Sequence, residues 1–127
     1  MKPWHGAAAS LFALLALASP AAGASAGCDR NCLDTMLSAF ESAVTDKDAA
    51  RAPLAIGFRE TANAVLTPPG IGPWQTVTAF GPVQRRYFDP VTGNALFFGT
   101  LTDRGEPAIA SLRLKVEGCR ESRRWIE

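Results

Sequence analysis

The stretch Asn94–Glu117, NALFFGTLTDRGEPAIASLRLKVE, decides the fold, because it predicts two β-strands that turn back on each other at the letters DRGE. In its second arm, apolar residues alternate with residues that are mostly polar or charged, which is the pattern of a half-buried strand. If Asp103 pairs with Glu106, the apolar side chains of both arms share one face. A bulge at Gly105 would instead shift the register by one residue and exchange the faces of one arm.

The first 26 residues predict a secretory signal peptide. Lys2 is followed by an apolar run over residues 7–18 and by small residues at 24–26, with cleavage expected after Ala26. A membrane anchor is the alternative, but the apolar run is shorter than the ~20 residues that cross a bilayer. We therefore expect one domain, residues 27–127, in a secreted or periplasmic protein with no membrane span in its mature form.

The charge balance argues against a nucleic-acid partner. The chain has 13 Lys and Arg against 12 Asp and Glu, so no basic surface is indicated. The single histidine, His5, lies in the predicted signal peptide, which excludes a histidine triad, a histidine base and a histidine zinc site from the mature chain. No motif indicates a cofactor or a metal.

Three cysteines, Cys28, Cys32 and Cys119, are the disulfide candidates. An exported chain meets oxidising conditions, so at least one disulfide is expected, and the odd count leaves one thiol over. Cys28 and Cys32 could close a small loop at a helix start, or one of them could pair with Cys119. The sequence leaves this choice open, because the geometry of the cysteines decides it.

The remaining elements follow in chain order. Apolar residues at three- and four-residue steps predict a helix over residues 29–45 with Asp29 as its N-cap. A short helical turn over 46–51, an irregular strand or hairpin arm over 56–66 and a proline- and glycine-rich loop over 67–74 come next. Residues 77–80 then lead through Gly81-Pro82 into a predicted strand over residues 83–89, with Arg85 and Tyr87 on the same face.

A helix followed by about four antiparallel strands predicts an α+β domain in which a curved antiparallel sheet wraps the N-terminal helix or helices. The chain resembles the cone-shaped superfamily of nuclear transport factor two, ketosteroid isomerase and the SnoaL-like polyketide cyclases, and more narrowly a group of small secreted proteins of that fold with unassigned function. The motifs that carry the resemblance are Cys28-Asp29-Arg30-x-Cys32-Leu33, Thr61-x-Asn63, Gly70-x-Gly72-x-Trp74, Asp89-Pro90-x-x-Gly93 and Leu112-Arg113-Leu114-Lys115-Val116.

Two departures from that group matter. Ala62 stands where the group has an acidic residue, and the likeness fades after Val116. The second departure predicts that the last strand of the cone is missing or altered. The neighbouring strand edge would then be open to pairing with a second copy of the chain.

The resemblance implies an apolar cavity between sheet and helix that accepts small hydrophobic molecules. The candidate ligand-binding residues are Trp74, Arg85, Tyr87 and Arg113. Trp74 could line the cavity or fill the open end of the core, and the second role is favoured. Arg113 reaches the cavity only if its side of the strand is the concave one.

Three functions are compatible with these residues. The favoured one is a small-molecule binding module without catalysis. The first alternative is an isomerase or cyclase acting on a hydrophobic carbonyl compound, with Tyr87 as the phenolic donor and Asp34, Glu60 or Asp89 as the base. The second alternative is a structural protein that forms a homodimer through its sheet. The missing histidine and Ala62 favour binding over catalysis.

Overall fold

The computed structural model describes residues 27–117 and the backbone of residues 124–125. The predicted signal peptide and Cys119 lie outside the described residues. In chain order the elements are α1 (Arg30–Thr45), η1 (Ala49–Arg51), β1 (Glu60–Ala62), β2 (Val65–Thr67), α2 (Pro73–Thr76), β3 (Val77–Asp89), β4 (Asn94–Asp103), β5 (Glu106–Glu117) and β6 (Arg124–Trp125).

Helix α1 begins where the sequence predicts it. The Asp29 side chain accepts a hydrogen bond from the backbone N–H of Cys32 at 2.8 Å, which satisfies one of the free donors of the first turn. The apolar stripe of the helix is buried against the sheet, with Leu33 and Leu37 fully enclosed. The predicted helix over residues 29–45 is confirmed.

The long sheet has the strand order β3-β4-β5-β6, and its described pairs are antiparallel. Asp103 pairs with Glu106 across the two-residue turn Arg104-Gly105, whose φ angles are +52° and +83°. Such a turn suits the twist of a hairpin and leaves no bulge. Leu101 therefore lies opposite Ala108, and the first of the two predicted registers is confirmed.

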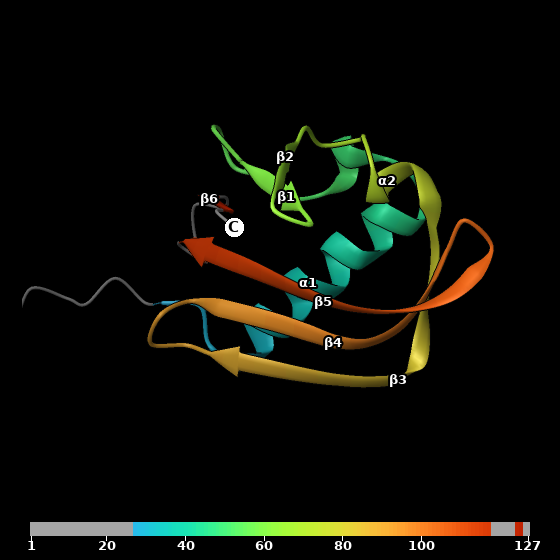
Figure 1. Ribbon diagram of the computed structural model, residues 1–127. Helices are drawn as coiled ribbons and strands as arrows, with labels where there is room; N and C mark the ends of the chain where they lie inside the picture. The colour runs from blue at the N-terminus through green and yellow to red at the C-terminus, as the bar shows by residue number, and fades with distance from the viewer. Residues whose placement is uncertain (1–26, 118–123, 126–127) are drawn as a thin grey trace, which may run out of the picture.

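Strand β3 is irregular opposite the middle of β4. The pairing shifts between Phe80 and Gln84, across from Gly99. A Cβ on Gly99 would lie 2.5 Å from the carbonyl oxygen of Val83, so only glycine allows the two strands to approach this closely. The irregularity lets the strands bend around α1, as Figure 1 shows.

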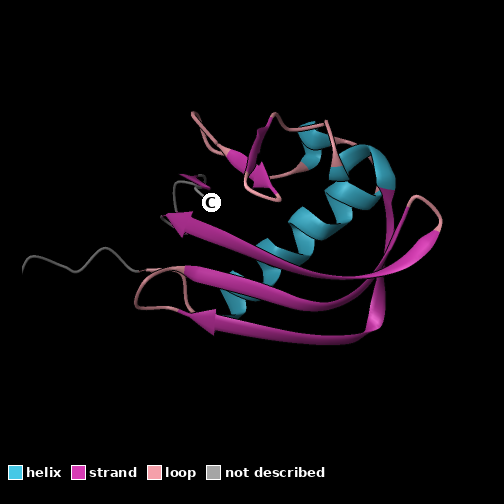
Figure 2. Ribbon diagram, viewed as in Figure 1, coloured by secondary structure: helices cyan, strands magenta, loops and turns pink. Residues whose placement is uncertain are grey.

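The inner and outer faces of the sheet are now distinguished. Ala95, Phe97, Leu114 and Val116 are buried and pack with the stripe of α1. Figure 2 shows α1 on one side of the long strands, with the short hairpin β1–β2 on that same side. The leucine face is therefore the concave one, and Arg113 projects from the other face. A helix packed on antiparallel sheets confirms the predicted α+β class.

The first hairpin is tighter than expected. One arm over residues 56–66 was anticipated, but β1 and β2 both fall in this region and pair Ala62 with Val65. Asn63 and Ala64 form the turn with φ of +51° and +64°. Asparagine tolerates this conformation, whereas alanine adopts it at a cost. The local sequence indicates this turn only through Asn63, because asparagine adopts a positive φ more readily than most residues.

Strand β6 covers only the end of the sheet. It pairs with Val116 and Glu117, and no other described strand lies beside the outer edge of β5. Within residues 27–117 and 124–125, no helix combines the length and the apolar character needed to cross a membrane.

Candidate functional site

A cavity of about 600 Å³ lies between the concave face of the sheet, the second half of α1 and the β1–β2 hairpin. This volume falls within the usual range for small-molecule sites, roughly 300–1,000 Å³. Its apolar lining consists mainly of Phe40, Val44, Val77, Phe80, Phe97, Leu101, Ala108, Ala110 and Leu112. Its polar lining includes Glu60, Thr61, Asn63, Thr76, Asp103 and Arg104.

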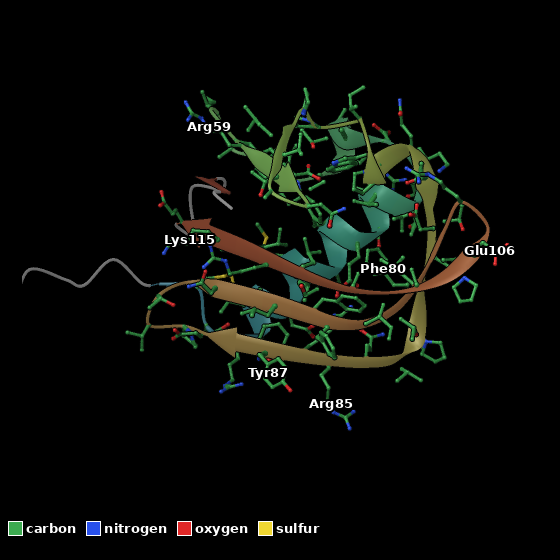
Figure 3. The ribbon with its side chains drawn as sticks, viewed as in Figure 1. Arg59, Phe80, Arg85, Tyr87, Glu106 and Lys115 are labelled. Carbon is green, nitrogen blue, oxygen red and sulfur yellow. A yellow bond between two sulfur atoms is a disulfide. The ribbon has the colours of Figure 1, made fainter. Side chains whose placement is uncertain are left out.

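Aromatic side chains of the sheet form the apolar floor. The Phe80 and Phe97 rings meet edge to face with centroids 5.1 Å apart, a favourable geometry for aromatic pairs. Phe97 is fully buried, and Phe80 projects from β3 on the side of α1 (Figure 3). Leu101 follows Phe97 by four residues along β4, so strand alternation places both side chains on the same face. Phe97 and Leu101 thus belong to the apolar face that the ribbon pattern predicted, and Phe80 joins them from β3.

Trp74 fixes one wall of the cavity without lining it. Its ring is buried and meets Phe40 edge to face at 5.1 Å. The indole Nε1–H donates to Glu60 Oε2 at 2.7 Å, and the Glu60 side chain is itself buried. A buried carboxylate needs such donors. The pair therefore ties α2 to the hairpin and holds Glu60, which lines the cavity, in place.

The polar end of the cavity is made where β3 and β4 meet. Val77 pairs with Asp103, and the backbone N–H of Arg104 donates to the carbonyl of Thr76 at 3.0 Å. Asp103 belongs to the concave face by strand alternation, in the same series as Phe97 and Leu101. Its Oδ1 is buried and has no hydrogen-bond partner among the residues that the structure describes. An acidic side chain thus projects from the same face as the apolar floor.

Three predicted ligand-binding residues lie on the other face of the sheet. Tyr87 is 57% exposed, Arg85 and Arg113 are exposed, and none of the three lines the cavity. Figure 3 shows Arg85 and Tyr87 pointing away from α1. The curvature of the sheet decides this placement, because it makes the leucine face concave. Of the four predicted ligand residues, Trp74 alone is on the cavity side, and it packs behind the wall.

The predicted base candidates separate in space. Asp34 is exposed on α1 and accepts a hydrogen bond from Arg86 at 2.7 Å, and it does not line the cavity. The Asp89 side chain accepts a hydrogen bond from the backbone N–H of Val91 at 3.0 Å, within the turn between β3 and β4. Hydrogen bonding from Thr92 lowers the pKa of Asp89 below 3.8. Glu60 is the one candidate of the three that lines the cavity.

Arg86 was missed by sequence reasoning, yet it joins the sheet to the helix. Its guanidinium bonds Asp34, Ser38 at 2.8 Å and the buried carboxylate of Glu41. Burial raises the pKa of Glu41 above 4.5 and outweighs the opposing effect of Arg86. The signal available was strand alternation, which placed Arg86 on the face of Gln84 and Phe88. These groups stabilise the helix–sheet contact and are not part of the cavity lining.

The disulfide candidates are resolved in part. Cys28 and Cys32 form a disulfide with Cα atoms 5.3 Å apart, at the start of α1. This is the small-loop alternative. Among the described residues, no group of three or more histidine, cysteine or acidic side chains is arranged to hold a metal ion.

Comparison with known proteins gives no relative on which to rest an assignment. The chain matches no protein-family model, no curated protein and no solved structure. The resemblance to the cone superfamily stays a prediction, and the function is argued from the geometry of the cavity.

Proposed function

We propose that this protein binds a small hydrophobic molecule in the cavity between the sheet and the β1–β2 hairpin, without a catalytic step. The observation that carries the proposal is the cavity itself, which has an apolar floor and a polar end. The volume of about 600 Å³ falls within the range of small-molecule sites, and the apolar side chains on its floor offer contact area to a hydrophobic ligand.

Binding is favoured over the isomerase or cyclase alternative by the position of the phenol. Tyr87 is the only tyrosine of the chain, and it lies on the outer face. Its hydroxyl therefore has no route to an oxyanion inside the cavity. An isomerase or cyclase would have to use Glu60 as its base, and a donor other than a tyrosine would have to stabilise the oxyanion.

A secreted or periplasmic location, after signal-peptide cleavage near Ala26, is part of this proposal. The Cys28–Cys32 disulfide supports it, because structural disulfides persist mainly in oxidising compartments. A binding protein of the cone superfamily would fit the same location.

The test is native mass spectrometry of the chain from Gly27 onward, purified from its own host. The expected result is a retained small molecule in the native protein. An Ala110→Trp variant, which places an indole in the cavity lining, should lose it. The matched control is Arg113→Trp, which adds the same side chain to the outer face of β5 and should retain the molecule. Retention by Ala110→Trp would show that the molecule binds elsewhere.

A second proposal concerns the outer face of the sheet, which we propose is covered by a second copy of the chain. Four large apolar side chains project there from three strands: Val83 at 70%, Tyr87 at 57%, Phe98 at 55% and Ile109 at 75% exposure. Exposed apolar groups gathered on one face favour a protein contact. The open edge of β5 offers a further point of pairing.

Sedimentation of the purified chain tests the dimer. We expect a dimer that Phe98→Glu dissociates, because a carboxylate would be buried at the centre of the contact. Val91→Glu is the control, since Val91 is equally apolar but lies in the β3–β4 turn, away from this face. A monomer at all accessible concentrations would refute the dimer and leave the cavity proposal intact.

A further inference from the structure

The cavity lining carries two carboxyl groups, those of Glu60 and Asp103, and one guanidinium, that of Arg104. The indole N–H of Trp74 is already directed to Glu60. This composition describes the head group that the cavity would accept, and the inference that follows rests on the proposed binding function.

Asp103 is the acidic group that carries the inference. It lies on the concave face at the end of β4, and no donor within residues 27–117 reaches its buried Oδ1. No described cation lies within ion-pair distance of its carboxylate, although Arg104 is its neighbour in sequence. Arg104 occupies the turn with a positive φ, and its side chain is exposed. The described residues therefore place no cation beside this carboxylate, in contrast to Glu41, which has Arg86.

A buried acceptor without a donor destabilises a fold, and it is satisfied when a donor is brought to it. A carboxylate gains most from a charged donor, because charge-assisted hydrogen bonds are about twice as strong as neutral ones. A molecule with a cationic head would also be attracted by the negative charge of Asp103, whereas an anionic head would be repelled by it.

We propose that the cavity takes an amphipathic amine, with its apolar body on the floor formed by Phe80, Phe97 and Leu101 and its ammonium group at Asp103. The floor supplies apolar contact along β4, and Asp103 lies at the end of that strand. Rotation of the Asp103 carboxylate about χ2 brings either oxygen toward the head group, since this torsion is broad. The ligand class is thus a primary alkylamine and not a fatty acid.

Isothermal titration of the chain from Gly27 onward with decylamine, decanol and decanoate at neutral pH tests this. The three probes share one apolar chain and differ only in the head group. Because the apolar floor contacts the shared alkyl chain, we expect all three probes to bind. Decylamine should bind at least about tenfold more tightly than decanoate, which is the ratio expected from one charge-assisted hydrogen bond.

Two variants assign the head group to its partner. Asp103→Asn keeps the shape and removes the charge, and it should weaken decylamine binding by about tenfold while changing decanol binding by less than about twofold. Glu106→Gln is the matched control, because Glu106 pairs with Asp103 across the same turn but does not line the cavity. It should leave the affinities for all three probes unchanged. Thermal melting of each variant reports whether it folds.

The outcomes separate this inference from the proposed function. If none of the three probes binds, the cavity proposal itself fails. If decanol and decanoate bind as tightly as decylamine, the cavity binds apolar molecules but the amine class is wrong. An Asp103→Asn variant that folds and keeps the native preference for decylamine would overturn the role of Asp103.

Discussion

Replacing Arg86 by methionine should remove the strongest polar contact between α1 and the sheet. Methionine keeps much of the aliphatic length of arginine but leaves Glu41, which is 7% exposed, without its cation. Removing one partner of a buried ion pair typically costs 3–5 kcal/mol. The Arg86 side chain is 25% exposed, so we expect the lower end of that range, about 3 kcal/mol.

The contact with Asp34 adds little to this figure. The Asp34 side chain is 52% exposed, and ion pairs at such sites contribute about 0–1 kcal/mol. Asp34→Ala should therefore lower the free energy of unfolding by no more than about 1 kcal/mol. Most of the effect of Arg86→Met comes from the unpaired charge on Glu41, so a second substitution that removes this carboxylate should restore stability.

Urea unfolding of the chain from Gly27 onward, followed by circular dichroism at neutral pH, measures these differences. Arg86→Met should lower the free energy of unfolding by about 3 kcal/mol and shift the urea midpoint down accordingly. The double variant Arg86→Met/Glu41→Leu should return to within about 1 kcal/mol of the native protein, since apolar replacements of buried pairs are often neutral. A loss below about 1 kcal/mol for Arg86→Met, or a double variant as unstable as the single one, would refute this account of the contact.

Three further outcomes are expected from the same unfolding assay. Ala64→Gly should stabilise the β1–β2 hairpin by about 0.5–1 kcal/mol, because glycine adopts the φ of +64° without strain, and a loss of stability would contradict this. Replacing Cys28 and Cys32 together by alanine should lower the free energy of unfolding by about 2 kcal/mol, the loop-closure contribution of so short a loop. An unchanged free energy of unfolding would show that the disulfide does not stabilise the fold. Because burial raises the pKa of Glu41 above 4.5, the folded chain holds that proton more tightly than the unfolded chain, so this group makes stability fall as pH rises through the interval that begins near 4.5. Glu41→Gln should flatten that fall, and an unchanged pH profile would contradict it.

The sequence was sufficient where local patterning and burial agree. The alternation in Glu106–Glu117 and the turn letters DRGE identified the ribbon, and the structure selected the register with Asp103 opposite Glu106 from the two that the sequence left open. The stripe and the N-cap at Asp29 identified α1. In each case, one rule of periodicity and one of turn or cap chemistry point to the same structure.

The site was predicted less well, because it depends on the direction in which the sheet curves. Strand alternation put Arg85 and Tyr87 on one face of β3 correctly, but alternation alone does not say which face is concave. The irregularity opposite Gly99 sets the curvature, and it arises from contacts between distant residues. Tyr87 was therefore assigned to a cavity that lies on the other side of its own strand.

One other feature required a long-range contact that no local pattern encodes, whereas the position of Asp103 could have been predicted. Glu60 and Trp74 are fourteen residues apart, and they meet because α2 returns beside the hairpin. Asp103 was read as a turn residue, which it is, but its place in the series of Phe97 and Leu101 was available from the register. Combining turn chemistry with strand parity would have placed it on the cavity side.

The most direct measurement of the central claim is where a bound ligand lies. Nuclear Overhauser contacts from the alkyl chain of decanol to assigned side chains report this in solution. The account predicts contacts to Phe97, Leu101 and Ala110 on the concave face. Contacts confined to Tyr87 and Phe98, on the outer face, would contradict it and would make that exposed surface the binding site.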